Sequence, residues 1–205
     1  MLIGDSMRLG IDIDDTTFIT VKAMLKYGDI YDTEVVGGKG TNGNLGLITN
    51  RYYLKALYGW DDKTKFSFFD TYYKNILEES YPMEDAVSII NRLKEKGNEI
   101  YFITARLLNI KNCDTENITK DSLKKYNISY DKLIINAADK LKFCLENKID
   151  IFIEDSFDTC KELESHGIKV FLMTTKMNEN IDSGSIERVH SWKELEIKLM
   201  DYLEK

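Results

Sequence analysis

Residues 8–17 read RLGIDIDDTT, an apolar run that leads directly into three aspartates and two threonines. Such a run is typical of a strand that is buried on both faces of a sheet. Asp12, Asp14 and Asp15 then lie within four positions, where like charges repel and raise one another's pKa. A helix start needs only one capping aspartate. Three of them predict a site for a divalent cation, because Mg²⁺ prefers oxygen ligands and is often held by carboxylates.

Length and composition limit the class of protein. The chain has 205 residues, of which 43% are hydrophobic, which suits one domain or a core with a small insert. Its formal net charge of -7 argues against nucleic-acid polymers and anionic membrane surfaces as partners. Three cysteines form no CxxC motif, and the N-terminus has no signal-peptide pattern. We therefore expect a cytoplasmic protein.

Short apolar runs alternate with helical patterns along most of the chain. This alternation predicts an α/β fold, in which helices cover both faces of a parallel sheet. The expected strands are 9–13, 99–104, 132–136, 150–155 and 169–173, and the expected helices between and after them are 84–97, 119–127, 139–148, 156–167 and 191–205.

The segment between the first two strands is far longer than a crossover requires. Helical patterns at 18–28, 46–60 and 65–80 predict a small helical cap over residues 17–81, inserted after the first strand. The core then comprises residues 1–16 and 82–205.

Polar side chains follow several of the expected strands. Ligands bind beyond the carboxyl ends of parallel strands, so these side chains should meet at one edge of the sheet. They are Asp12 and Asp14 after the first strand, Thr104 and Arg106 after the second, Lys140 at the helix start after the third, and Glu154 and Asp155 after the fourth.

This order of groups resembles the four motifs of the haloacid dehalogenase-like (HAD) superfamily of phosphatases. The motifs stand here as DIDDT with Asp12 and Asp14, FITAR with Thr104, NAADK with Lys140, and IEDS with Asp155. The resemblance implies a Rossmannoid core. The ITAR sequence and the helical insert resemble the 5'(3')-deoxyribonucleotidase branch, which includes bacterial nucleotidases.

The resemblance implies a role for each group. Asp12 would be the nucleophile that forms an aspartyl-phosphate, and Asp14 the general acid and base. Thr104 and Lys140 would hold the phosphoryl oxygens, and Mg²⁺ would be bound by Asp12, Asp155 and the backbone carbonyl of Asp14. Substrate contacts are further expected from Arg106, which could reach a phosphate or a cap carboxylate, and from Phe18 among the cap aromatics.

Some choices stay open at this point. Lys142 competes with Lys140, because both lie near the same helix start, and Glu154 is expected to support Asp155 rather than to bind the ion. The expected substrate is a nucleoside monophosphate, with a sugar phosphate or other small metabolite phosphate as the alternative. A homodimer is compatible with the sequence. A phospho-receiver domain is disfavoured, because no aspartate ends the third strand, KLIIN. A non-catalytic binding module is disfavoured as well, because the expected site positions all have chemically competent side chains.

Overall fold

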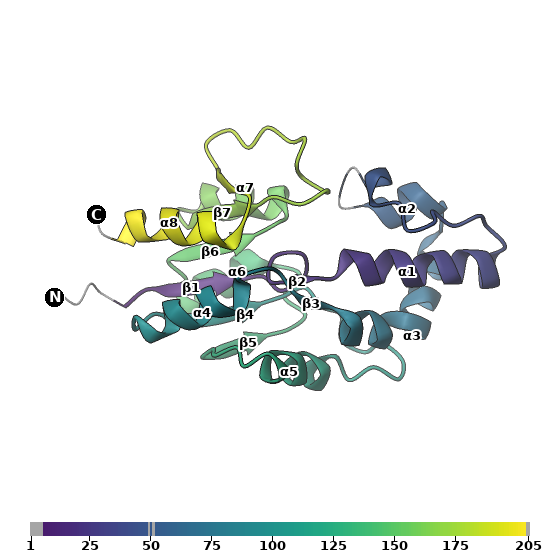
Figure 1. Ribbon diagram of the computed structural model, residues 1–205, viewed down its shortest axis with the longest axis horizontal. Helices are drawn as coiled ribbons and strands as arrows, with labels where there is room; N and C mark the ends of the chain where they lie inside the picture. Colours follow the sequence, from purple (N-terminus) through teal and green to yellow (C-terminus); the bar gives the residue numbers. More distant parts are fainter. Residues whose placement is uncertain (1–5, 49, 51, 204–205) are drawn as a thin grey trace.

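The computed structural model describes residues 6–48, 50 and 52–203, which fold around a six-stranded sheet (Figure 1). All its neighbouring strands are parallel, in the order β5-β4-β1-β6-β7-β8. The strands are β1 (Arg8–Ile11), β4 (Glu99–Ile103), β5 (Lys132–Ile134), β6 (Ile151–Glu154), β7 (Lys169–Met173) and β8 (Glu187–Val189).

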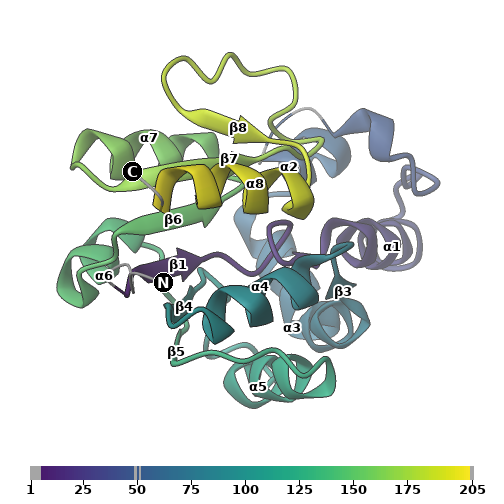
Figure 2. The same cartoon turned by 60° about the vertical axis from the view of Figure 1, so that its left-hand side comes forward.

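Helices cover both faces of this sheet, which confirms the predicted α/β fold (Figure 2). Helices α4 (Ala86–Glu95), α5 (Thr115–Lys125) and α8 (Trp192–Leu203) contribute buried residues to the cluster on one face. Helices α6 (Lys140–Asn147) and α7 (Phe157–Ser165) do so on the other. Strand residues alternate between the two clusters, as the two-residue period of a strand requires.

The central strand approaches its neighbour very closely. A Cβ atom on Gly10 would lie 2.3 Å from the Phe152 ring of β6, so glycine is the residue that fits there. The same register pairs Ile11 with Phe102 of β4 and with Ile153 of β6. Asp12, the next residue, is therefore held between the ends of two strands.

The insert forms helices that lie beyond the carboxyl ends of the strands (Figure 1). A two-stranded antiparallel pair, β2 (Phe18–Ile19) and β3 (Tyr81–Pro82), joins its two ends. Its helices are α1 (Val21–Tyr31), the π-helical turn η1 (Asp32–Val36), the 3-10 turn η2 (Leu45–Leu47), α2 (Tyr53–Tyr58) and α3 (Asp62–Glu79). Trp60 and Phe68 are buried in a cluster formed by the insert's own residues.

Several predicted boundaries were wrong. The first helix of the insert begins at Val21 rather than at residue 18, because Phe18 and Ile19 pair with β3. The predicted helix 46–60 contains only part of η2 and the short α2, while its residues 49 and 51 lie outside the described part. Strand β8 was not predicted, because its sequence ERV has no apolar run.

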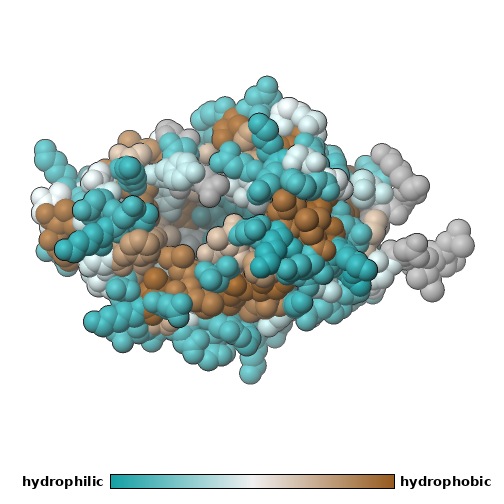
Figure 3. All heavy atoms as spheres, turned by 180° about the vertical axis from the view of Figure 1, so that it is seen from behind, coloured by the Kyte–Doolittle hydropathy of each residue, from teal (hydrophilic) through white to brown (hydrophobic). Residues whose placement is uncertain are grey.

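The surface mixes residue types. Seen from behind, it shows hydrophilic and hydrophobic groups around a central hollow (Figure 3). No helix within the described residues is long and apolar enough to cross a membrane.

Candidate active site

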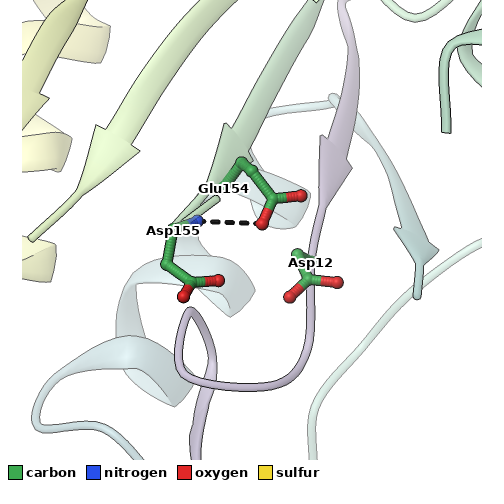
Figure 4. Close-up of side chains that lie close together, drawn as sticks. All are labelled: Asp12, Glu154 and Asp155. Carbon is green, nitrogen blue, oxygen red and sulfur yellow. Dashed lines mark hydrogen bonds between the residues drawn. The ribbon is translucent and has the colours of Figure 1, made fainter. Parts of the chain in front are cut away.

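Three carboxylates lie close together at the carboxyl ends of β1 and β6 (Figure 4). Asp12 follows β1, Glu154 ends β6, and Asp155 comes directly after it. Each offers an oxygen that lies within 4.8 Å of the others. The parallel register thus brings together acidic residues that are far apart in the sequence.

Lys140, the first residue of α6, neutralises part of this charge. Its Nζ lies 2.6 Å from Asp12 Oδ1 and also donates to Glu154 Oε2. Burial by itself lowers the pKa of Lys140, but the charges of Asp12 and Glu154 outweigh it and raise that pKa. Lys142 is exposed, and its backbone N–H caps the helix by donating to Asp139 Oδ1 at 3.0 Å. The geometry therefore favours Lys140 over Lys142.

Burial disfavours the charged forms of Asp12 and Asp155. It raises the pKa of Asp12 to about 7, with Glu154 and Asp14 adding to the effect and Lys140 opposing it. Burial, followed by the charges of Glu154 and Asp12, also raises the pKa of Asp155 well above its ordinary value. Burial is thus the main cause of both shifts, and the neighbouring carboxylates add to it.

The donor set fits a divalent cation. Within the described residues, Lys140 forms ion pairs with Asp12 and Glu154 but not with Asp155, so three ionised carboxylates beside one ammonium have an excess of two negative charges. Glu154 is fully used, because its Oε1 accepts from the N–H groups of Asp155 and Ser156, both at 3.0 Å, and its Oε2 from Lys140. Asp12 and Asp155 thus keep oxygens for an ion, which matches how Mg²⁺-type ions are held.

Asp14 faces a different partner. Arg106 donates to both of its carboxylate oxygens, from Nη2 to Oδ1 at 2.8 Å and from Nε to Oδ2 at 3.0 Å. Thr20 Oγ1 adds a third bond at 2.7 Å. Burial tends to raise the pKa of Asp14, but the charge and hydrogen bonds of Arg106 outweigh it and lower that pKa. In this structure Arg106 therefore binds the carboxylate of Asp14.

Asp15 has a structural role at the start of α1. It adopts a left-handed backbone conformation with φ of 57°. Its Oδ1 accepts from the N–H groups of Thr20 and Val21, both at 3.0 Å, and so caps the start of α1. Capping by an acidic side chain is a common reason for aspartate at a helix start, and here it explains one of the three aspartates.

A cavity of about 240 Å³ opens beside these groups. It brings together Asp12, Asp14, Thr104, Arg106 and Lys140, all residues expected at the site. Glu154 and Asp155 lie next to Asp12, as described above.

The prediction that Phe18 contacts the substrate is corrected by its position. Phe18 is 1% exposed, does not line the cavity, and packs edge-on against Tyr126 in the main core. It belongs to β2, whose pairing with β3 turns it inward.

Two further residues near the site were not foreseen. Tyr73 of α3 lines the cavity, and the buried Asn178 donates to the carbonyls of Asp155 at 2.7 Å and Met173 at 2.8 Å. An aromatic residue in a helical pattern predicts only packing, and an asparagine in a loop carries no signal of its own. Neither could have been selected from the sequence.

Comparisons with known proteins identify the family of the chain. A family model described as "5' nucleotidase, deoxy (Pyrimidine), cytosolic type C protein" matches residues 49–201. A nucleotidase from Clostridium acetobutylicum is 30% identical over 146 residues, which cover 71% of this chain and 73% of the relative.

Solved structures share the fold. A predicted phosphatase from Clostridium acetobutylicum has a TM-score of 0.72 at 14% identity, over 96% of this chain and 99% of the other. A haloacid dehalogenase-like hydrolase from Streptococcus pneumoniae has a TM-score of 0.67 at 12% identity, over 96% and 98%. The resemblance to HAD phosphatases is thereby confirmed, and the chain belongs to the cytosolic type C 5'-nucleotidase family, an enzyme family of phosphatases on the HAD fold.

Proposed function

We propose that the protein hydrolyses nucleoside monophosphates with the help of Mg²⁺, through an aspartyl-phosphate formed on Asp12. The observation that carries this proposal is the position of Asp12, which lines the cavity, accepts a hydrogen bond from Lys140 and lies close to the acidic pair Glu154 and Asp155. A buried carboxylate next to an ammonium and a cation site is suited to attack phosphorus, because the surrounding positive charge offsets repulsion from the phosphate.

In the first step, a carboxylate oxygen of Asp12 bonds to phosphorus, and the bond from phosphorus to the leaving oxygen breaks. Asp14 gives that oxygen a proton. The ion pair with Arg106 keeps Asp14 ionised beforehand, so the proton must enter with the substrate, whose phosphate has a second pKa near 6. Lys140 and Thr104 would hold the transferring phosphoryl oxygens.

In the second step, water attacks the aspartyl-phosphate, Asp14 accepts the proton of that water, and phosphate leaves Asp12 as a free carboxylate. The ionised state that Arg106 favours suits this role as a base. A Mg²⁺ ion held by Asp12 and Asp155 would stabilise negative charge on the phosphoryl group.

The direct test is Asp12→Asn, which keeps the side-chain shape but removes the attacking charge. We expect turnover to fall about 10³-fold or more, with an unchanged circular-dichroism spectrum. Glu146→Gln, an exposed change on α6, is the matched control and should keep wild-type activity. An Asp12→Asn variant that turns over substrate at the wild-type rate would exclude this mechanism.

The choice of nucleotides rests on the family match and on the nucleotidase relative. One observation favours a smaller sugar phosphate instead: Tyr73 is the single aromatic residue in the cavity wall, within the described residues. Rates with deoxynucleoside monophosphates and with sugar phosphates, each with and without a chelator, separate the two. Higher kcat/KM for sugar phosphates would reject the nucleotide assignment and leave the phosphatase chemistry in place.

A further inference from the structure

Tyr73 is the contribution of the insert to the cavity. Within the described residues, the other lining groups come from the core, on the loops and helix starts that follow β1, β4, β5 and β6. Tyr73 belongs to α3 and is 6% exposed. Any part of a substrate that extends from the phosphate toward the insert therefore passes this side chain.

One hydrogen bond holds the hydroxyl group of Tyr73, with the hydroxyl oxygen as the acceptor. It accepts a hydrogen bond from the backbone N–H of Leu107 at 2.9 Å. The ring packs edge-on against Phe69 of the same helix, with centroids 5.5 Å apart. No described residue accepts the hydroxyl hydrogen, which leaves one donor available at the wall of a polar cavity.

Tyr73 lines the same cavity as Asp14, the residue proposed to act on the leaving oxygen. In-line displacement places the leaving oxygen opposite the attacking Asp12, and Asp14, which is proposed to protonate that oxygen, lines the cavity together with Tyr73. The charges of Asp14 and Arg106 both act on the Tyr73 hydroxyl, which agrees with this proximity, although burial is the largest cause of its raised pKa.

We infer that Tyr73 is a specificity-determining residue, whose hydroxyl donates a hydrogen bond to a sugar oxygen of the phosphomonoester. This inference rests on the proposed phosphatase function and deepens it. A tyrosine hydroxyl preorganised by Leu107 favours substrates whose alcohol part carries an oxygen near the ester, and it gives no such advantage to an aryl phosphate.

The test compares Tyr73→Phe with the wild type on three substrates: a deoxynucleoside 5'-monophosphate, deoxyribose 5-phosphate and p-nitrophenyl phosphate. The variant keeps the ring and loses the hydroxyl. We expect kcat/KM for both sugar-containing substrates to fall about tenfold more than for the aryl phosphate, mainly through a higher KM, as for the loss of one hydrogen bond.

Asp70→Ala is the matched structural control. Asp70 is an exposed residue of α3 whose Oδ1 accepts from the backbone N–H of Lys111 at 3.1 Å, so it ties the same helix to the same loop outside the cavity. We expect this variant to leave the ratio of sugar-containing to aryl substrates unchanged.

The remaining outcomes are decisive. If Tyr73→Phe lowers all three activities equally, or changes none, Tyr73 does not contact the sugar and the inference is wrong. If Asp70→Ala shifts the ratio as Tyr73→Phe does, the effect arises from the loop and the inference is also wrong. Failure of the wild type to hydrolyse any of the three substrates would instead reject the proposed function.

Discussion

At the scale of single residues, three neighbouring aspartates have three different partners. Asp12 contacts Lys140, Asp14 binds Arg106, and Asp15 caps α1. The sequence predicted a charged site from their crowding, but it did not pair Arg106 with Asp14, because these two residues lie 92 positions apart and no local pattern joins them. The choice between Lys140 and Lys142 also stayed open, because helical spacing alone does not show which side of the helix faces the site.

Replacing Lys140 by methionine tests its contribution. Lys140→Met leaves Asp12 and Glu154 buried without their cation, so we expect unfolding free energy to fall by about 3 kcal/mol and turnover to fall about 10²- to 10³-fold. Lys142→Met, on the exposed side of the same helix, should change stability by less than about 0.5 kcal/mol. Urea unfolding and steady-state rates measure both effects, and equal behaviour of the two variants would contradict the assignment.

At the scale of elements, most strands of the six-stranded sheet were predictable from their short apolar runs. The five predicted strands correspond to β1, β4, β5, β6 and β7. The misses have a common physical cause. Strands β2, β3 and β8 have only two or three residues and form through pairing with distant segments, which no local pattern records.

The start of α1 depends on Asp15, which has a left-handed φ and accepts hydrogen bonds from two backbone N–H groups. Alanine is strained at this φ and has no side-chain acceptor for those N–H groups. We expect Asp15→Ala to lower the unfolding free energy by about 2 kcal/mol. Asp15→Asn keeps an acceptor oxygen and tolerates the left-handed region, so it should be far milder.

The stability of Asp15→Asn relative to the wild type should depend on pH. Burial raises the pKa of Asp15 to about 7, partly offset by hydrogen bonds from Val21 and Thr20, against an ordinary value of 3.8. The folded state thus holds this proton more tightly, and the carboxyl costs stability increasingly as pH rises from about 4 to about 7. In urea unfolding with chelator, the stability of Asp15→Asn relative to wild type should therefore be higher at pH 7.5 than at pH 5. The opposite trend would contradict the assigned shift.

At the scale of the whole molecule, the site is assembled by contacts between distant segments. The indole of Trp192 at the start of α8 donates to the carbonyl of Thr16 at 3.0 Å, and Thr16 Oγ1 donates to Asp155 Oδ1 at 3.2 Å. The order of motifs was enough to predict which core residues meet, because the parallel fold fixes where strands end. The insert has no such rule, so the place of Tyr73 in the cavity and of Phe18 in the core emerged only from the structure.

This assembly predicts that metal binding stabilises the entire fold. At about one hundred times its dissociation constant, Mg²⁺ adds about 2.7 kcal/mol, or roughly 5–10 °C in Tm for a chain of this size. Asp155→Asn should lose most of this shift, because it removes one of the two available carboxylates.

Without metal, however, the same variant should be more stable than the wild type at neutral pH, since burial and the charges of Glu154 and Asp12 make the ionised Asp155 unfavourable. Thermal unfolding with chelator, with Mg²⁺ and with NaCl of equal ionic strength measures these effects. An equal Mg²⁺ shift in both proteins would show that the ion binds elsewhere, whereas a metal-free variant less stable than the wild type would show that the three carboxylates do not repel one another.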